Sequence, residues 1–231
     1  MGRREDPLTF AAKIAFVKLR LLRILELIVI IVVEGISAAG KTTWCRRHAP
    51  ERLVPETFPG DRHRQPSEGQ QAAQYWTNWN AKRWGDAVEI EKSEGQAVCD
   101  TDPLKLHFLW SLWQIGEASE TQWQLQLAST EQAIADRKLG FADLYLVKII
   151  DPDVARQQRD GDTTRSRDRF DLHVRLQPTL IRWYQALETA LGGRVAWSLP
   201  EALPDRKERI SNPFRFDVRK FREFTSTLAN P

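Results

Sequence analysis

The stretch EGISAAGKTTW, residues 34–44, constrains this chain more than any other part of its sequence. It satisfies the pattern G-x-x-x-x-G-K-[ST] through Gly35, Gly40, Lys41 and Thr42. Glycine lets the backbone curl around phosphate, so that loop N–H groups and the next helix N-terminus face negative charge. The lysine of this pattern reaches the β/γ-phosphates and the hydroxyl ligates Mg²⁺. We therefore expect a phosphate site formed by Gly35, Ser37, Ala38, Ala39, Gly40, Lys41, Thr42 and Thr43.

The flanking segments predict a strand before this loop and a helix after it. LIVIIVV, residues 27–33, is an unbroken branched apolar run of strand length. Such a run is typical of a parallel strand that is covered on both faces. KTTWCRRHA then contains no glycine or proline before Pro50, so a short helix can begin at the loop.

Strands and helices alternate along the rest of the chain, which favours a doubly wound parallel sheet. We expect strands at 27–33, 52–56, 96–103, 142–150 and 194–199. Helices are expected at 68–95, near 103–113, near 119–138, as an Arg-rich helix–turn–helix over 151–173, and from about Arg215. The fold class is thus α/β: a P-loop NTPase fold with a five-stranded parallel sheet, helices on both faces and an Arg-rich lid.

The chain divides into three predicted parts: an extension at 1–26, a core domain at 27–204 with its lid at about 155–172, and a basic helical tail at 205–231. Lys18, Arg20, Arg23 and Glu26 interrupt the apolar N-terminal stretch, leaving runs far short of the roughly 20 residues of a spanning helix. We expect no transmembrane segment. The extension is interpreted as a basic amphipathic helix that packs on the domain or touches a membrane surface. The alternative is that these residues are an upstream artefact of the choice of start codon.

Composition indicates a modest cytoplasmic enzyme. The 231 residues suit one domain with an appended segment, and 34 basic against 31 acidic residues give a net charge of +3. That balance does not favour nucleic acid as a partner. Cys45 and Cys99 read as two reduced thiols without a disulfide. The chain shows no heptad seam, and a homodimer is left open.

Carboxylates follow two of the predicted strands. Ligands of open parallel sheets lie beyond the carboxyl ends of the strands, so Glu56, Asp100 and Asp102 are expected near the phosphate loop. Phosphoryl transfer needs an acceptor for the attacking hydroxyl's proton, and Glu56 is the candidate base. Asp100 is placed to hold Mg²⁺ through water or to bind a substrate hydroxyl, with Asp102 as a second hydroxyl acceptor. The alternatives are a solvated loop carboxylate for Glu56 and a helix cap for Asp102.

Arginines are dense between the last two strands. Guanidinium groups make bidentate contacts with phosphate oxygens, and the intervening DGDTT is a flexible turn. We interpret the segment as a lid that closes over the transferring group, the alternatives being a solvated charged face or RNA contact. The arginines concerned are Arg156, Arg159, Arg165, Arg167 and Arg169.

The expected helix at 68–95 contains three tryptophans, Trp76, Trp79 and Trp84. Trp76 and Trp79 are three residues apart and share a helix face, which can cover a planar base or ring of the substrate. The alternative is that both side chains are core. Trp84 is the third tryptophan of this helix, and no stacking role is assigned to it.

These motifs resemble the P-loop nucleoside kinases, in the deoxynucleoside kinase and thymidylate kinase group. VEGISAAGKTT, LVPE and DLYLVKIIDPDVARQQRDGDTTRSR are similar to that group's phosphate loop, strand-two glutamate and lid, in the same order. The resemblance implies that Glu56 is the general base and that Arg159, Arg165 and Arg167 stabilise the transferred phosphate. CDTDP departs from the group's acidic-Arg motif. It is similar to the Asp-Thr-Asp of bacterial ribosylnicotinamide kinase domains, which contacts the substrate sugar.

Together these observations predict an ATP- and Mg²⁺-dependent kinase that phosphorylates a hydroxyl of a nucleoside or nucleoside-like small molecule. Nucleoside monophosphates and antibiotic hydroxyls are rival acceptors that the sequence does not separate. A nucleotide-binding switch with little phosphotransfer is the alternative from another class, motivated by the basic ends KLRLLR and RKFREF.

Overall fold

The computed structural model describes residues 29–60, 65–161, 169–205 and 211–228. The predicted N-terminal extension at 1–26 and the predicted lid residues Arg165 and Arg167 lie outside the described residues.

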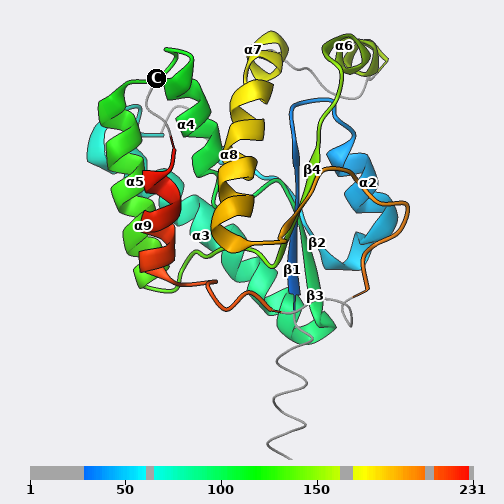
Figure 1. The fold of residues 1–231 in the computed structure, drawn as a ribbon, viewed down its shortest axis with the longest axis horizontal. Helices are drawn as coiled ribbons and strands as arrows, with labels where there is room; N and C mark the ends of the chain where they lie inside the picture. The colour runs from blue at the N-terminus through cyan, green and yellow to red at the C-terminus, as the bar shows by residue number, and fades with distance from the viewer. Residues whose placement is uncertain (1–28, 61–64, 162–168, 206–210, 229–231) are drawn as a thin grey trace, which may run out of the picture.

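A five-stranded sheet with the order β2-β3-β1-β4-β5 forms the centre of the molecule, and every neighbouring pair is parallel (Figure 1). In register, Val33 of β1 lies opposite Asp100 of β3 and Leu146 of β4. The carboxyl ends of the three central strands therefore meet at one edge of the sheet. The predicted five-stranded parallel sheet is confirmed, with strands β1 Val29–Gly35, β2 Leu53–Val54, β3 Gln96–Asp100, β4 Leu144–Lys148 and β5 Val195–Ala196.

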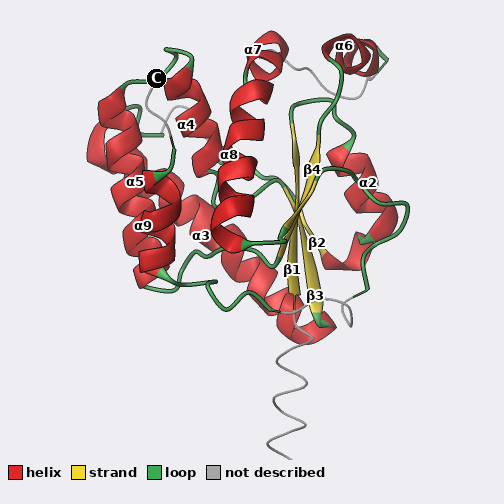
Figure 2. Cartoon of the chain, viewed as in Figure 1, coloured by secondary structure: helices red, strands yellow, loops and turns green. Residues whose placement is uncertain are grey.

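Helices flank the sheet on both faces (Figure 2). α2 lies on one face, whereas α3, α4, α5, α8 and α9 lie on the other. α6 and α7 stand at the end of the sheet where β1 and β4 terminate. The helices are α2 Lys41–His48, α3 Gly69–Glu94, α4 Leu106–Gln114, α5 Glu120–Ala135, α6 Pro152–Asp160, α7 Phe170–Arg175, α8 Gln177–Leu191 and α9 Val218–Ser226.

Alternate residues of β1 enter two separate cores, because successive strand side chains point to opposite faces. Ile30 and Val32 pack with the aromatic side chains of α3, α4, α5, α8 and α9. Ile31 and Val33 pack with Trp44 and its neighbours on the α2 side. All of these β1 side chains are fully buried, which explains why the sequence reads as an unbroken apolar run.

α8 was not among the helices expected from the sequence. Its apolar side chains recur at helical spacing as Leu180, Trp183, Tyr184, Leu187 and Leu191, and all five are buried. This spacing is the usual signal of an amphipathic helix. α8 matters for the site because Tyr184 reaches the loop after β3.

The C-terminal segment is anchored to the core by both apolar and ionic contacts. Phe221 and Phe224 of α9 are fully buried in the aromatic core. Ahead of them, Arg215 donates two hydrogen bonds of 2.7 Å to Glu91 of α3 and also pairs with Asp143. Asp143 in turn accepts the N–H of Ile30 at 2.6 Å, which joins this segment to β1.

No helix within the described ranges 29–60, 65–161, 169–205 and 211–228 combines the length and the apolar character that crossing a membrane requires.

Candidate active site

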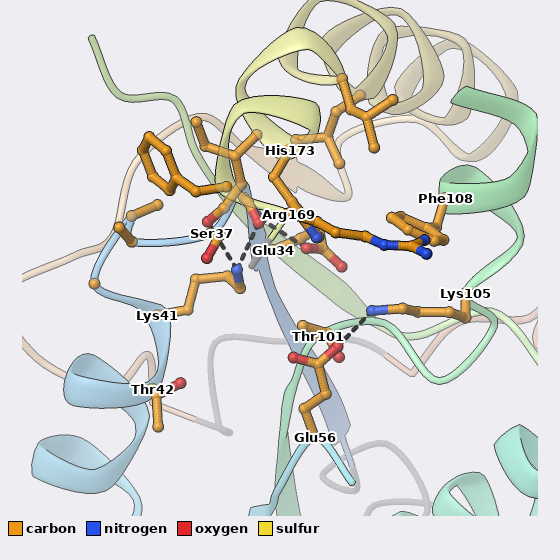
Figure 3. Close-up of a pocket in the computed structure, with 18 of the residues that line it drawn as sticks. Glu34, Ser37, Lys41, Thr42, Glu56, Thr101, Lys105, Phe108, Arg169 and His173 are labelled. Atoms are coloured by element: carbon orange, nitrogen blue, oxygen red, sulfur yellow. Dashed lines mark hydrogen bonds and ion pairs between the residues drawn. The ribbon is translucent and has the colours of Figure 1, made fainter. Parts of the chain in front are cut away.

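A cleft of about 1160 Å³ lies at the edge of the sheet where the strands end. The segments that follow β1, β2 and β3 line it, together with residues of α7. Parallel strands direct their connecting loops to the same edge, so side chains distant in sequence converge there. Figure 3 shows the side chains that face this cleft.

The phosphate loop forms one wall of the cleft. Lys41 begins α2 and its ammonium donates hydrogen bonds to the carbonyls of Gly35 at 2.5 Å and Ile36 at 3.0 Å. Gly40 has a positive φ of 83° at the helix N-cap, a conformation that glycine adopts without strain. The cleft is lined by every residue that the sequence predicted for phosphate, namely Gly35, Ser37, Ala38, Ala39, Gly40, Lys41, Thr42 and Thr43.

Gly35 has a steric reason to be glycine. A Cβ at this position would lie 2.6 Å from the backbone oxygen of Lys148 at the end of β4. Real Cβ atoms do not approach backbone oxygen so closely, and the residue has a φ of 151°. The close contact between β1 and β4 therefore fixes where the phosphate loop starts.

Thr42 and Asp100 meet at the foot of the loop and offer oxygen ligands. The Thr42 hydroxyl donates a 2.6 Å hydrogen bond to Oδ2 of Asp100. Oδ1 of Asp100 is buried and has no hydrogen-bonding partner among the described residues. Burial raises the pKa of Asp100, against the lowering effects of the Thr42 hydrogen bond and the Lys41 charge. An incompletely satisfied buried carboxylate beside a threonine hydroxyl fits the hard oxygen ligands that Mg²⁺ prefers.

Glu56 faces the loop from the opposite wall of the cleft. It follows β2 and forms an ion pair of 2.5 Å with the ammonium of Lys105. Figure 3 shows the two side chains pointing toward one another. Both are partly exposed, at 26% for Lys105 and 29% for Glu56, so a ligand can reach them.

Asp102 lies beneath the cleft instead of lining it. It is 1% exposed, and its Oδ1 accepts the backbone N–H of Leu104 at 2.9 Å. Its Oδ2 accepts a longer hydrogen bond of 3.4 Å from the Tyr184 hydroxyl. Burial raises the pKa of Asp102 to about 7. The side chain thus stabilises the turn after β3. It does not cap the next helix, as the alternative had it, because the N-cap of α4 is Lys105 and no side chain caps it.

A buried glutamate braces the phosphate loop against that same turn. Glu34 is 2% exposed; its carboxylate accepts the N–H of Gly35 at 2.9 Å and the N–H of Asp102 at 3.0 Å. Nε2 of His107 lies 3.4 Å from the same carboxylate. Burial lowers the pKa of His107 to about 4, so this imidazole is neutral near pH 7. Burial raises the pKa of Glu34, but its positive neighbours, Lys41 and Lys105 among them, bring it below the ordinary value.

The structure separates the two tryptophans that the sequence grouped. Trp76 lines the cleft and also borders a smaller cavity of about 120 Å³ between α3 and α5. Trp79 does not line the cleft; its indole N–H donates to the carbonyl of Thr57 at 3.0 Å. Trp84 is 1% exposed and belongs to the aromatic core.

Of the described arginines in the predicted lid, Arg169 lines the cleft, whereas Arg156 and Arg159 do not. Arg159 pairs with Asp160 at 2.8 Å and lies over the ring of Phe170 at 4.5 Å. Arg169 precedes α7 and its side chain projects into the cleft in the direction of Phe108 (Figure 3).

Sequence reasoning missed several cleft residues, namely Glu34, Phe58, Lys105, His107, Phe108 and His173. Lys105 and Phe108 belong to the start of α4, where a helix was expected but not its orientation. Phe108 stacks on His173 with ring centroids 5.6 Å apart, a contact between segments 65 residues apart in the chain (173 − 108). No spacing within the sequence signals such a pair.

No protein-family model matches this chain, and no curated protein matches it. Among solved structures, that of "NadR protein in complex with NR" shares 16% identity with a TM-score of 0.51, covering 92% of this chain and 55% of that one. That of "NadR protein in complex with NAD and AMP-PNP" shares 17% identity with a TM-score of 0.48, covering 92% and 53%. This chain thus spans about half the length of the NadR structures. With the sheet order and the phosphate loop, the first likeness places the chain in the α/β P-loop class of folds.

Proposed function

We propose that this chain is an ATP- and Mg²⁺-dependent phosphotransferase that acts on a hydroxyl of a nucleoside or nucleoside-like small molecule. One observation carries the proposal: a phosphate loop with Lys41 and a carboxylate, Glu56, face each other across a single cleft large enough for two ligands. A loop that only binds nucleotide needs no carboxylate opposite it. A hydroxyl acceptor does, because its proton must leave as the bond to phosphorus forms.

In this proposal each wall of the cleft has its own task. The loop N–H groups and Lys41 neutralise the β/γ-phosphate oxygens, for which Lys41 exchanges its carbonyl partners for phosphate. Glu56 accepts the proton of the attacking hydroxyl. Arg169, with the lid residues Arg159, Arg165 and Arg167, meets the charge that grows on the transferred group.

Mg²⁺ would be held by the Thr42 hydroxyl, with Asp100 binding through water. When bound, the ion would neutralise the charge that develops on the phosphate oxygens. The buried, unpartnered Oδ1 of Asp100 supports this assignment, because a water ligand of the ion would satisfy it.

Changing Asp100 to asparagine is therefore expected to raise the Mg²⁺ concentration needed for tight ATP binding by about 10- to 100-fold. Calorimetric titration of ATP at a series of Mg²⁺ concentrations measures this without any acceptor. The matched control is Asp86→Asn, an exposed carboxylate on α3. If ATP binding depends on Mg²⁺ concentration in the same way in the two variants, Asp100 is not part of the metal site.

The part of the cleft opposite the phosphate loop, here called the acceptor half, would hold the substrate that receives the phosphate. Its lining supports a planar, nucleoside-like substrate. Trp76, Phe58 and Phe108 present aromatic side chains to the cleft, and Phe58 is 65% exposed. Exposed aromatic faces are suited to stacking on a base or heterocycle. The NadR structure with the similar fold contains NR, which makes ribosylnicotinamide a compound to test first.

The experiment is ADP release from ATP and Mg²⁺ with a panel of acceptors: nucleosides, ribosylnicotinamide, nucleoside monophosphates and hydroxylated antibiotics. We expect one class to stimulate ADP release, and Lys41→Ala to abolish the stimulation. If only monophosphates or only antibiotics stimulate ADP release, that class is the acceptor instead of a nucleoside. Tight ATP binding without stimulation by any compound would favour the nucleotide-binding switch.

A further inference from the structure

Lys105 is the residue through which α4 reaches the proposed base. It sits at the N-cap of α4, and its ammonium contacts Oε1 of Glu56 at 2.5 Å. The same ammonium lies 5.6 Å from the ring centre of Phe108, one turn along the helix. The Glu56 carboxylate is thus held from the side of the acceptor half.

The backbone at Lys105 adopts a conformation that is costly for lysine. Its φ of 50° lies in the left-handed region, which a residue other than glycine adopts only at a cost in free energy. Four described non-glycine residues have positive φ, and three of them, Ala38, Thr101 and Lys105, line the cleft. Strain that gathers in this way persists only where surrounding contacts enforce it, and it is enriched at functional sites.

A buried arginine enforces that geometry. Arg83 of α3 is 4% exposed and donates to the carbonyl of Pro55 at 3.2 Å, next to Glu56. Its Nη2 donates to the carbonyls of Asp100 at 2.8 Å and Thr101 at 3.2 Å, on the turn that leads to Lys105. Arg83 therefore ties together the two backbone segments that carry the Glu56–Lys105 pair.

We propose that Lys105 is a positioning residue: it holds the Glu56 carboxylate ionised and aimed into the cleft until the acceptor hydroxyl arrives. This inference rests on the proposed function, in which Glu56 is the base. In the transfer step, the acceptor O–H bond breaks and its proton goes to Glu56. The acceptor oxygen forms a bond to the γ-phosphorus, and the bond to the β-phosphate oxygen breaks, its electron pair leaving with ADP.

The charges around Glu56 support this role for Lys105. Burial acts to raise the pKa of Glu56, but the charge of Lys105, followed by Lys41, the Lys105 hydrogen bond and Arg83, lowers it to about 2. The other titratable groups that share its surroundings are Glu34 near the end of β1, Asp100 at the end of β3, His107 on α4 and His173 on α7. Lys105 is the one described residue whose side chain touches the Glu56 carboxylate.

Without Lys105, both its charge and its hydrogen bond stop lowering the pKa of Glu56, and burial is opposed by Lys41 and Arg83, so this pKa should rise from about 2. A base works only when it is deprotonated. The acid limb of the kcat/KM profile should therefore move to higher pH in Lys105→Met. At one pH unit below the raised pKa we expect that variant to lose about tenfold in kcat/KM, with the loss recovered at higher pH.

The test compares wild type with Lys105→Met, Lys105→Arg and Lys92→Met. Lys92 pairs with Glu89 at 2.7 Å on an exposed face of α3, so its removal breaks a lysine–glutamate pair far from the cleft's chemistry. Two quantities are measured: the pH profile of kcat/KM, and the Glu56 pKa by carboxyl ¹³C NMR, assigned with Glu56→Gln. A circular dichroism melt confirms that each variant is folded.

We expect Lys105→Met to raise both the acid limb and the Glu56 pKa, Lys105→Arg to restore both, and Lys92→Met to change neither. A Glu56 pKa in Lys105→Met equal to that of wild type would overturn the inference. An unchanged acid limb despite a raised pKa would overturn it as well. If even wild type transfers no phosphate, the proposed function fails by itself, and the NMR titration then decides whether Lys105 holds Glu56 ionised.

Discussion

Replacing Glu56 with glutamine is expected to lower kcat for phosphoryl transfer by about 10²- to 10⁴-fold, the usual contribution of a general base. Glutamine keeps the shape of the side chain but cannot accept a proton. ATP affinity should stay the same, because Glu56 pairs with Lys105 on the wall opposite the phosphate loop and does not contact that loop. The measurement is steady-state turnover with the stimulating acceptor, together with calorimetric ATP binding.

Glu51→Gln provides the matched control, because Glu51 is exposed just ahead of β2. We expect its turnover to equal that of wild type. Intact turnover in Glu56→Gln would show that Glu56 is a solvated carboxylate and that the hydroxyl proton leaves by another path. Loss of ATP binding in the same variant would instead indicate damage to the cleft as a whole.

Replacing Arg215 with methionine is expected to cost about 3–5 kcal/mol of unfolding free energy, the typical result of breaking a buried ion pair on one side. Arg215 neutralises two buried carboxylates, Glu91 at 4% and Asp143 at 0% side-chain exposure. Without it both buried carboxylates lose the guanidinium that they share, and among the described residues only Lys92 near Glu91 and Arg194 near Asp143 still supply positive charge. Urea denaturation, followed by fluorescence, measures the loss.

The loss should depend on pH in a defined direction. Burial raises the pKa of Glu91 in the native protein, and removing Arg215, which lowers it, must raise it further. A group with a raised native pKa stabilises the fold at low pH and loses that contribution as pH rises. The deficit of Arg215→Met should therefore be smaller at pH 5 than at pH 8.

Arg222→Met is the control for this prediction. Arg222 pairs with Glu131 at 2.6 Å, but its side chain is 66% exposed, so its removal should cost no more than about 1 kcal/mol. Equal costs for Arg215→Met and Arg222→Met would mean that the buried network contributes no more than a surface pair.

The phosphate loop shows why part of the site was predictable. Its residues are contiguous, and each has a local reason for its identity: glycine for a positive φ at Gly40, lysine and threonine for phosphate and metal. The strands were predictable for a similar reason, because a buried parallel strand must be apolar on both faces. Helix α8 carried an equally local pattern and was missed only in interpretation.

The opposite wall of the cleft could not be predicted in the same way. In the sequence Lys105 looks like an ordinary residue at the start of an expected helix. Its pairing with Glu56 joins positions 49 residues apart, which the sequence does not reveal. The pair depends on the left-handed turn at Lys105 and on Arg83, which ties the two backbones together. Likewise, only the packing of the turn after β3 shows that Asp102 is buried beneath the cleft while Asp100 reaches Thr42.

By itself the sequence determined the fold class, the phosphate loop and the edge of the sheet where the cleft lies, because periodicity and loop chemistry act between near neighbours. Tertiary structure alone decided which charged side chains face that loop. Trp76 reached the cleft and Trp79 did not, although they share a helix face in sequence. The physical reason is that burial and electrostatic pairing depend on distances between segments, which are set only when the strands come into register.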